Sequence, residues 1–243
     1  MEKRIITKGD LKKISKLTNI YNSNLYINGE DLIKSLNYPV LGDSFAIMEK
    51  KFELLDKITE QEYILPKYLL YLESLNASNL KAYGMKHFVD YDVIEKMIHD
   101  GNCSYKDKLE ICKKICDAFI NLEKYKIAYW DIHSDNILVK GKDIKICDMD
   151  EVTFKLTDGD YAYRSDLADS YRYLTSLVLS ILYEIDESDL IRILERKRSR
   201  KFVRESKMFS RVASSEGYIF YPDKYLDMFT EDYVKETREM LIK

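Results

Sequence analysis

The chain has 243 residues, a formal net charge of −3 and an apolar content of 46%. Chains of this length form one or two domains, and this apolar fraction is typical of a globular protein with a buried core. A net charge so close to zero gives no general attraction to nucleic acid or to acidic membranes. No apolar run reaches the roughly 20 residues that a membrane-spanning helix needs. The four cysteines lack the close spacing of a disulfide framework. We therefore expect a cytoplasmic protein with reduced thiols and with no membrane or nucleic-acid partner.

The first third of the chain combines strand patterns with one helix pattern. Short apolar runs predict four strands, at residues 24–27, 32–34, 68–72 and 80–85. Asn28-Gly29 joins the first two runs and tolerates the positive φ angles of a two-residue turn, so these runs predict a hairpin. Apolar residues at three- and four-residue steps then predict an amphipathic helix over 44–58, with Ser44 as its N-cap.

From Asp90 onward the pattern becomes mainly helical. Long amphipathic or apolar segments predict helices at residues 104–125, 165–185 and, as a pair, 222–243. Ser104 is the expected N-cap of the first of these helices. A strand-rich part followed by a helical part predicts an α+β fold. We place the boundary so that the strand-rich part comprises residues 1–86 and the helical part residues 87–243, together forming one domain.

The segment 129–150 holds the most informative residues of the chain. Asp131, Asn136 and Asp148 lie on loops that border two short apolar runs, which predict strands. An aspartate can accept a proton, and an asparagine and a second aspartate can bind a divalent metal ion. Together they form the residue set of a phosphoryl-transfer site, whose chemistry depends on positioning and on the neutralisation of charge.

This segment resembles the catalytic loop of the protein-kinase-like superfamily, written His-Arg-Asp-x-x-x-x-Asn in standard members. Asp148 stands where that family has the aspartate of Asp-Phe-Gly, with Met149 in place of Phe and Asp150 in place of Gly. The resemblance implies a two-lobed fold. The strand-rich part would be a small N-lobe with an antiparallel sheet and one helix, and the helical part would be a larger C-lobe. It also implies that Asp131 orients the acceptor hydroxyl and takes its proton, and that Asn136 and Asp148 hold Mg²⁺ against the phosphates of ATP.

The resemblance extends to the nucleotide-binding part of the family. Lys34 ends the run Asp-Leu-Ile-Lys, which is similar to the family's Val-Ala-Ile-Lys, where the lysine bridges the α- and β-phosphates. By the same resemblance, Glu49 on the predicted helix would pair with Lys34, and Glu53, about one turn further on, is the alternative partner. Met85 lies in the segment 83–86 that corresponds to the family's hinge, whose backbone would bind the adenine edge.

The sequence also departs from the family. Residues 18–24 read Thr-Asn-Ile-Tyr-Asn-Ser-Asn where a glycine-rich phosphate loop is expected. Tyr129 and Trp130 replace the usual His and Arg. Without that arginine a phosphorylated loop lacks its cationic partner, so we expect an activity that phosphorylation does not gate. His133, two residues after Asp131, makes the pattern similar to that of aminoglycoside and choline phosphotransferases. It is expected to act as a catalytic residue near the transferred phosphate.

Three functions stay open at this point. The leading one is a serine/threonine protein kinase that transfers the γ-phosphate of ATP to a protein hydroxyl with Mg²⁺. The second is a small-molecule phosphotransferase, which His133 favours. The third is a pseudokinase that binds a partner through the basic run at 195–201. A scaffold has no chemical need for the full set Lys34, Asp131, Asn136 and Asp148, so the set favours an active enzyme. The sequence does not define the oligomeric state.

Overall fold

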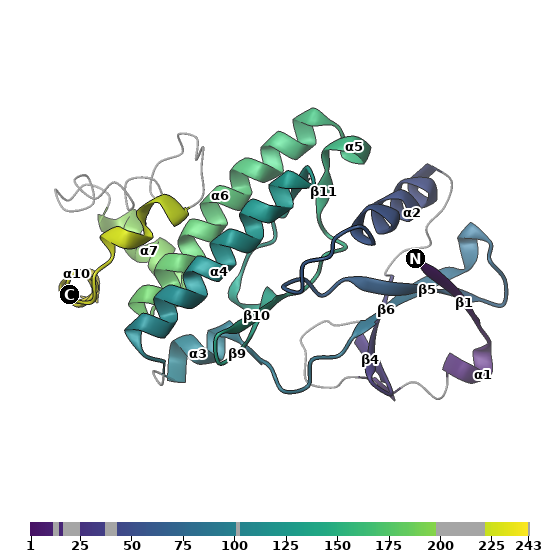
Figure 1. Ribbon diagram of the computed structural model, residues 1–243, viewed down its shortest axis with the longest axis horizontal. Coiled ribbons are helices and arrows are strands. Elements are labelled where there is room, and N and C mark those ends of the chain that lie inside the picture. Colours follow the sequence, from purple (N-terminus) through teal and green to yellow (C-terminus); the bar gives the residue numbers. More distant parts are fainter. Residues whose placement is uncertain (12–14, 17–24, 37–42, 101–102, 198–221, 243) are drawn as a thin grey trace. The chain divides into compact units, whose positions relative to one another are not determined.

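The computed structural model describes residues 1–11, 15–16, 25–36, 43–100, 103–197 and 222–242. The chain forms two compact units, both drawn in Figure 1: unit 1 comprises residues 1–90 and 147–150, and unit 2 comprises residues 91–146 and 151–243. The main division thus falls after Asp90, four residues later than the predicted one, and a short segment returns to unit 1. Unit 1 is rich in strands and unit 2 in helices, so the fold is of the α+β class, as predicted.

Unit 1 is built on one sheet. Its elements in chain order are β1 (Glu2–Ile6), α1 (Lys8–Leu11), β2 (Ser15–Lys16), β3 (Leu25–Asn28), β4 (Asp31–Ser35), α2 (Asp43–Leu55), β5 (Pro66–Leu72), the 3₁₀ turn η1 (Ala77–Asn79) and β6 (Leu80–Lys86). The six described strands lie in the order β1-β5-β6-β4-β3-β2. Neighbouring strands are antiparallel except β1 and β5, which run parallel.

The four strands predicted for this part of the chain are present as β3, β4, β5 and β6. The expected hairpin joins β3 to β4, and Gly29 in its turn has φ +63°. The helix α2 begins at Asp43, so Ser44 lies inside it rather than at its N-cap. The sheet is antiparallel, as expected, except at one edge, where β1 pairs in parallel with β5. Four of the five β1 residues are exposed and three are charged, so this edge strand lacks the apolar alternation that identifies a strand in a sequence.

The two faces of this sheet have different environments. On one face Ile33, Tyr68, Leu70 and Ala82 form a buried apolar cluster. On the other face α2 packs against the sheet, with the Phe52 ring centroid 5.3 Å from that of Tyr83 (Figure 1). Successive strand residues point to opposite faces, so the side chain after Ile33, which is Lys34, lies on the face that α2 covers. The fold thus places Lys34, the lysine expected to contact the nucleotide phosphates, on the face of the sheet that α2 covers.

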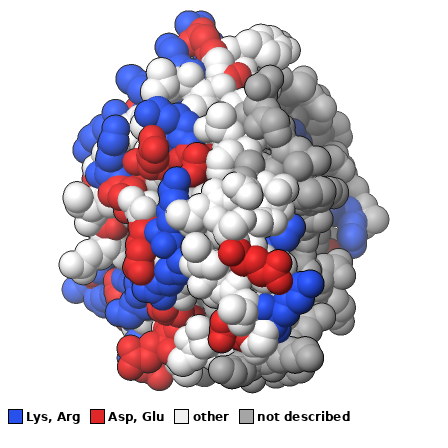
Figure 2. Space-filling model, turned by 90° about the vertical axis from the view of Figure 1, so that its right-hand side faces the viewer, with Lys and Arg blue, Asp and Glu red and all other residues white. Residues whose placement is uncertain are grey.

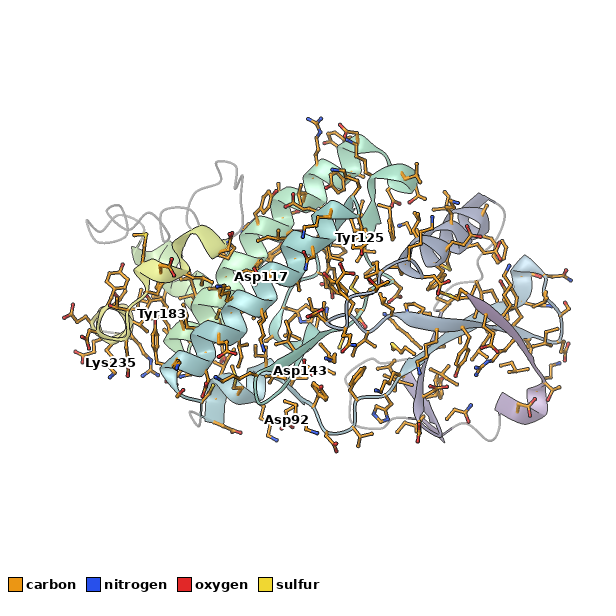
Figure 3. All side chains as sticks on the ribbon, in the orientation of Figure 1. Asp92, Asp117, Tyr125, Asp143, Tyr183 and Lys235 are labelled. Atoms are coloured by element: carbon orange, nitrogen blue, oxygen red, sulfur yellow. The ribbon has the colours of Figure 1, made fainter. Side chains whose placement is uncertain are left out.

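Unit 2 is built around two long helices. Its described elements are β7 (Asp92–Val93), α3 (Ile94–Asp100), α4 (Tyr105–Lys124), β8 (Ile127–Ala128), the 3₁₀ turn η2 (Ser134–Asn136), β9 (Ile137–Lys140), β10 (Asp143–Ile146), β11 (Thr153–Phe154), α5 (Lys155–Asp158), α6 (Asp160–Tyr183), α7 (Glu187–Lys197), the 3₁₀ helix η3 (Pro222–Met228) and α10 (Glu231–Ile242). Helices α4 and α6 lie side by side (Figure 1). Strands β7, β9 and β10 form a small antiparallel sheet, which Asp92 and Asp143 mark in Figure 3.

Helix α4 closely matches its prediction. The Ser104 hydroxyl accepts a hydrogen bond from the backbone N–H of Asp107 at 3.2 Å, which makes it the N-cap expected from the sequence. The buried face of the helix carries apolar side chains that include both of its cysteines: Ile111, Cys112, Ile115, Cys116 and Phe119. Burying side chains of this size stabilises a fold by about 1.5–3 kcal/mol each. The pair α4 and α6 therefore supplies much of the core of unit 2.

The C-terminal end of α6 is tied down by charged side chains. Glu184 follows the helix in a left-handed conformation, with φ +52°. Its carboxylate pairs with the ammonium of Lys108 from α4. Arg238 of α10 donates to the backbone carbonyl of Tyr183 at 2.6 Å, at the position labelled in Figure 3. These bonds hold α4, α6 and α10 together at one end of unit 2.

The described surface mixes charges of both signs. On the face shown in Figure 2, the described Lys and Arg side chains are interspersed with Asp and Glu rather than gathered into one region. None of the helices in the described ranges combines the length and the apolar character that a span across a membrane requires.

We expect that replacing Gly84 by alanine destabilises unit 1. A Cβ atom on Gly84 would overlap the ring of Tyr68, which is 2% exposed and whose hydroxyl donates to Asp31 at 2.9 Å. Because that ring cannot swing away freely, Gly84→Ala should lower the free energy of unfolding by about 1–3 kcal/mol, as measured by urea denaturation.

Gly9→Ala is the matched control. The nearest atom to a Cβ there is 3.5 Å away, so the change should stay within about 0.5 kcal/mol. Adding Gly84→Ala to a Tyr68→Leu variant should cost less than it costs the wild type. An equal cost in both backgrounds would show that the ring is not what the new methyl group meets.

Candidate functional site

Lys34 is held by two aspartates within unit 1. Its Nζ lies 3.0 Å from Oδ1 of Asp150 and 3.4 Å from Oδ1 of Asp148. The hydroxyl of Tyr83 donates to the same Asp150 oxygen at 2.5 Å. The three charged side chains are 19% (Lys34), 12% (Asp150) and 33% (Asp148) exposed. Asp150 is therefore the more enclosed of the two carboxylates, and Asp148 keeps more of its surface open to solvent.

Strand register explains why these groups meet. Lys34 of β4 stands directly opposite Tyr83 of β6 in the antiparallel ladder. Directly opposed residues project on the same face with their Cβ atoms about 4.5–5.5 Å apart. Both side chains therefore reach toward one point on the α2 side of the sheet. The segment 147–150 supplies the carboxylate at that point.

The structure gives Glu49 partners other than the expected Lys34. The Glu49 carboxylate pairs with Lys3 of β1 and accepts a hydrogen bond from the Tyr71 hydroxyl at 3.2 Å. The alternative, Glu53, pairs on the surface with Lys50 at 3.3 Å. The physical reason lies in β1, which brings Lys3 to the face that α2 covers. The lysine–glutamate pair implied by the resemblance is replaced by a lysine–aspartate pair.

Asp148 adopts an uncommon backbone conformation. Its φ of +54° lies in the left-handed region, which costs most side chains energy but which aspartate tolerates better. Conformations of this kind gather at functional sites, where the surrounding structure holds them in place. Burial, together with the neighbouring Asp148 carboxylate, raises the pKa of the adjacent Cys147 thiol to about 12, which disfavours the reactive thiolate.

Met85 lies inside the sheet, opposite Leu32 of β4 and Pro66 of β5. Its side chain is buried, and it is paired with residues of both neighbouring strands. The contact with the adenine edge that the resemblance implies stays a prediction. The predicted phosphate-loop residues 18–24 and the residues 198–201 of the basic run lie outside the described residues, as do the side chains of 195–197.

In unit 2, Asp131 and Asn136 are joined by hydrogen bonds. The Asn136 amide nitrogen donates to the Asp131 carboxylate at 3.1 Å and to the Asp131 backbone carbonyl at 3.0 Å. Asn136 is buried, whereas the Asp131 side chain is 33% exposed. One carboxylate is thus held in a fixed orientation with part of its surface open to solvent. Since the amide nitrogen makes these bonds, the carbonyl oxygen is the Asn136 atom suited to a cation.

Contacts with α4 and α6 hold the loop that carries Asp131 in place. The Tyr129 ring is buried and stacks on Phe119 of α4, with their centroids 5.8 Å apart. The Ser170 hydroxyl of α6 donates to the Tyr129 backbone carbonyl at 2.6 Å. Tyr129, which replaces the family's histidine, is therefore a structural anchor between the two long helices. Trp130 remains 40% exposed beside it.

His133 lies among carboxylates. Its Nε2 is 3.7 Å from Asp131 and its Nδ1 is 3.8 Å from Asp135. Interaction with the Asp131 carboxylate, helped by Asp135 and by Glu187 of α7, raises the pKa of His133 above its ordinary value against the opposing effect of burial. Glu187 also accepts a hydrogen bond from the Ser134 backbone N–H at 2.9 Å, which links the loop to α7. A protonated His133 is the form that this arrangement favours.

A cluster of three titratable side chains lies on α3 and directly before α7. The ligand atoms of Glu95, His99 and Asp186 lie within 4.8 Å of one another, and His99 pairs with Asp186 at 3.0 Å. The four-residue spacing of Glu95 and His99 on one helix is a signal that the sequence contains and that the predictions above do not use. Surface groups of this composition are common without a metal ion.

The structure brings the predicted residues together in two sets. Lys34 and Asp148 meet within unit 1, and Asp131, Asn136 and His133 meet within unit 2. The prediction from the sequence missed Asp150 as a partner of Lys34. The sequence shows the two acidic residues at 148 and 150, but which of them contacts Lys34 and Tyr83 depends on strand register.

No protein-family model matches this chain, and no curated protein has a sequence that matches it. Arguments about function therefore depend on the residues themselves.

We expect Asp131→Asn to lower the pKa of His133 toward the ordinary histidine value. Removing the carboxylate charge removes the largest influence that favours the imidazolium. The protein has only three histidines, so an NMR titration can follow each imidazole. A His133→Gln variant assigns the signal, and Asp189→Asn, on the exposed surface of α7, is the control.

The same interaction has a defined effect on stability. A raised pKa in the folded state stabilises the fold fully below the unfolded value of about 6.5, and this contribution is lost as the pH rises through the folded value. An unchanged His133 pKa in Asp131→Asn would contradict the assignment of Asp131 as its main partner.

Proposed function

We propose that this protein is an ATP-dependent phosphotransferase of the protein-kinase-like kind, which transfers the γ-phosphate to serine or threonine hydroxyls of a protein with the help of Mg²⁺. The observation that carries this proposal is the Asp131 loop, where a buried asparagine five residues later donates one hydrogen bond to the partly exposed Asp131 carboxylate and one to the Asp131 backbone carbonyl. A catalytic base needs such an orientation toward the proton it accepts.

The proposed role of Asp131 is to orient the acceptor hydroxyl and to receive its proton. An attacking hydroxyl must lose this proton as the new O–P bond forms. Asn136 keeps the carboxylate in one orientation, and Ser170 together with Phe119 fixes the backbone that carries it.

The proposed role of unit 1 is to hold the nucleotide. Lys34 supplies a positive charge for the phosphates and Asp148 a carboxylate for the metal ion. Each of the two expected metal ligands carries oxygen, the atom that Mg²⁺ prefers: Asp148 of unit 1 has a partly exposed carboxylate, and Asn136 of unit 2 has an amide oxygen. When bound, Mg²⁺ neutralises phosphate charge and orients the transferred group. By the resemblance, the backbone of the hinge segment 83–86 would contact the adenine edge.

A small-molecule acceptor is the second candidate, and His133 is the observation that favours it. The Asp-x-His-x-x-Asn pattern resembles that of aminoglycoside and choline phosphotransferases, and the structure places His133 within 3.7 Å of Asp131. A protonated imidazole there would counter the negative charge that develops during transfer. In either case the residue that receives the proton is Asp131.

The test of this proposal is Mg²⁺-dependent transfer of labelled γ-phosphate from ATP. Asp131→Asn keeps the shape of the side chain and an oxygen that accepts from Asn136, but it removes the base. We expect the kcat to fall about 100-fold or more while ATP affinity changes little. Asp148→Asn should weaken Mg²⁺-ATP binding as well. Asp227→Asn, on an exposed turn of η3, is the control.

The outcomes separate the candidates. Label on this protein or on a generic protein substrate, lost in Asp131→Asn, supports a protein kinase. Transfer only to an added amino sugar or amino alcohol supports the second candidate. Nucleotide binding without transfer, unchanged in Asp131→Asn, would indicate a pseudokinase. No Mg²⁺-ATP binding in a thermal-shift measurement would overturn the proposal altogether.

A further inference from the structure

A lysine that contacts phosphates must be held in place before the nucleotide arrives. Lys34 extends from the middle of a sheet on the face that α2 covers, and its side chain is only 19% exposed. An enclosed ammonium is costly unless a carboxylate lies within ion-pair distance. The identity of that carboxylate decides how Lys34 is oriented.

The geometry points to Asp150, fixed by Tyr83, as the positioning residue for Lys34, in place of a carboxylate on α2. This inference rests on the proposed function for the role of Lys34, but its contacts stand on their own. Asp150 makes the shortest described ion pair of Lys34, at 3.0 Å, and it is the more enclosed aspartate. Tyr83 donates to the same oxygen at 2.5 Å.

The two donors to Asp150 come from rigid elements. Lys34 and Tyr83 stand opposite each other on two neighbouring strands, and Phe52 of α2 packs on the Tyr83 ring. Tyr83 is 1% exposed, so its hydroxyl has a fixed position. A carboxylate that accepts from both donors is therefore fixed in turn, and it limits the directions in which the Lys34 ammonium can point.

Glu49 is engaged elsewhere. Its carboxylate is bonded to Lys3 and to Tyr71, on strands β1 and β5 at the edge of the sheet. Recruiting Glu49 to Lys34 would break both of these bonds. Asp148, 3.4 Å from Lys34 and more exposed, is the carboxylate better suited to a ligand. The two aspartates therefore divide the work: Asp150 orients the lysine, and Asp148 faces the nucleotide side.

The test measures Lys34 directly, without relying on turnover. An ammonium held in an ion pair with a carboxylate is shielded by its partner and reacts slowly with acylating reagents. Limited acetylation with acetic anhydride, read by mass spectrometry of the Lys34 peptide, should therefore be about 3- to 10-fold faster in Asp150→Asn. Tyr83→Phe should give a smaller change in the same direction, because it frees Asp150 to move.

Asp31→Asn is a matched control. Asp31 also accepts from a tyrosine and pairs with a lysine, Tyr68 at 2.9 Å and Lys67 at 3.4 Å, but it does so away from Lys34. The Asp31→Asn variant should therefore leave the acetylation rate of Lys34 unchanged. If Glu49→Gln accelerates Lys34 acetylation and Asp150→Asn does not, the inference is overturned. Should Asp150→Asn fail to fold, Tyr83→Phe and Glu49→Gln decide the matter.

Kinetics then connect the contact to function. If Lys34 binds the nucleotide as proposed, Asp150→Asn should lower kcat/KM for ATP by about 10- to 100-fold, and Asp150→Glu should restore part of it. A merely structural role would reduce the folded fraction without changing the acetylation rate of the folded protein. Faster acetylation in Asp150→Asn, with no ATP binding by the wild type, would support the positioning contact and overturn the proposed function. Normal turnover in all variants, with unchanged acetylation, would overturn the contact instead.

Discussion

The charge of Lys34 is the constraint on which much of unit 1 depends. A lysine on the helix-covered face of a sheet needs a carboxylate close by, because an enclosed unpaired ammonium is strongly destabilising. The residues that meet this need come from 147–150, a segment that belongs to unit 1 although the residues on both sides of it belong to unit 2. Asp148 adopts a left-handed backbone conformation at the point where the chain turns and the carboxylates of Asp148 and Asp150 lie near Lys34.

The sequence predicted those features that depend on local pattern. Asn28-Gly29 marks a hairpin because its conformational preference is local, and Ser104 marks a helix start because its hydroxyl reaches an amide three residues away. Asp131 and Asn136 were assigned to one site by one motif, and they are only five residues apart, so the hydrogen bond between them is a local one. In each case the interacting groups are close in sequence, so their spacing alone constrains the geometry.

The missed features that shape the Lys34 site depend on long-range pairing. β1 is a charged edge strand, held by its backbone ladder to β5 rather than by an apolar face, so no pattern identifies it. Without β1, the sequence gives the wrong partner for Glu49, because β1 carries Lys3, which pairs with the Glu49 carboxylate. The bonds of Asp150 to Tyr83 and Lys34 span 67 and 116 residues, and they depend on a strand register that spacing in the sequence does not encode.

The charge balance around Lys34 also bears on how a nucleotide would bind. Lys34, Asp148 and Asp150 together carry a formal charge of −1, the same sum as the lysine, the helix glutamate and the metal-binding aspartate of the family pattern. In the proposed function, an approaching polyphosphate would meet this net negative charge, and the repulsion would be strong where water is partly excluded. A divalent cation bound to Asp148 would reverse the balance, since it adds two positive charges next to the phosphates. In the proposed function the second aspartate thus takes the place of the family's glutamate: it holds the lysine in place, and a metal ion on Asp148 would supply the positive charge that offsets the phosphates.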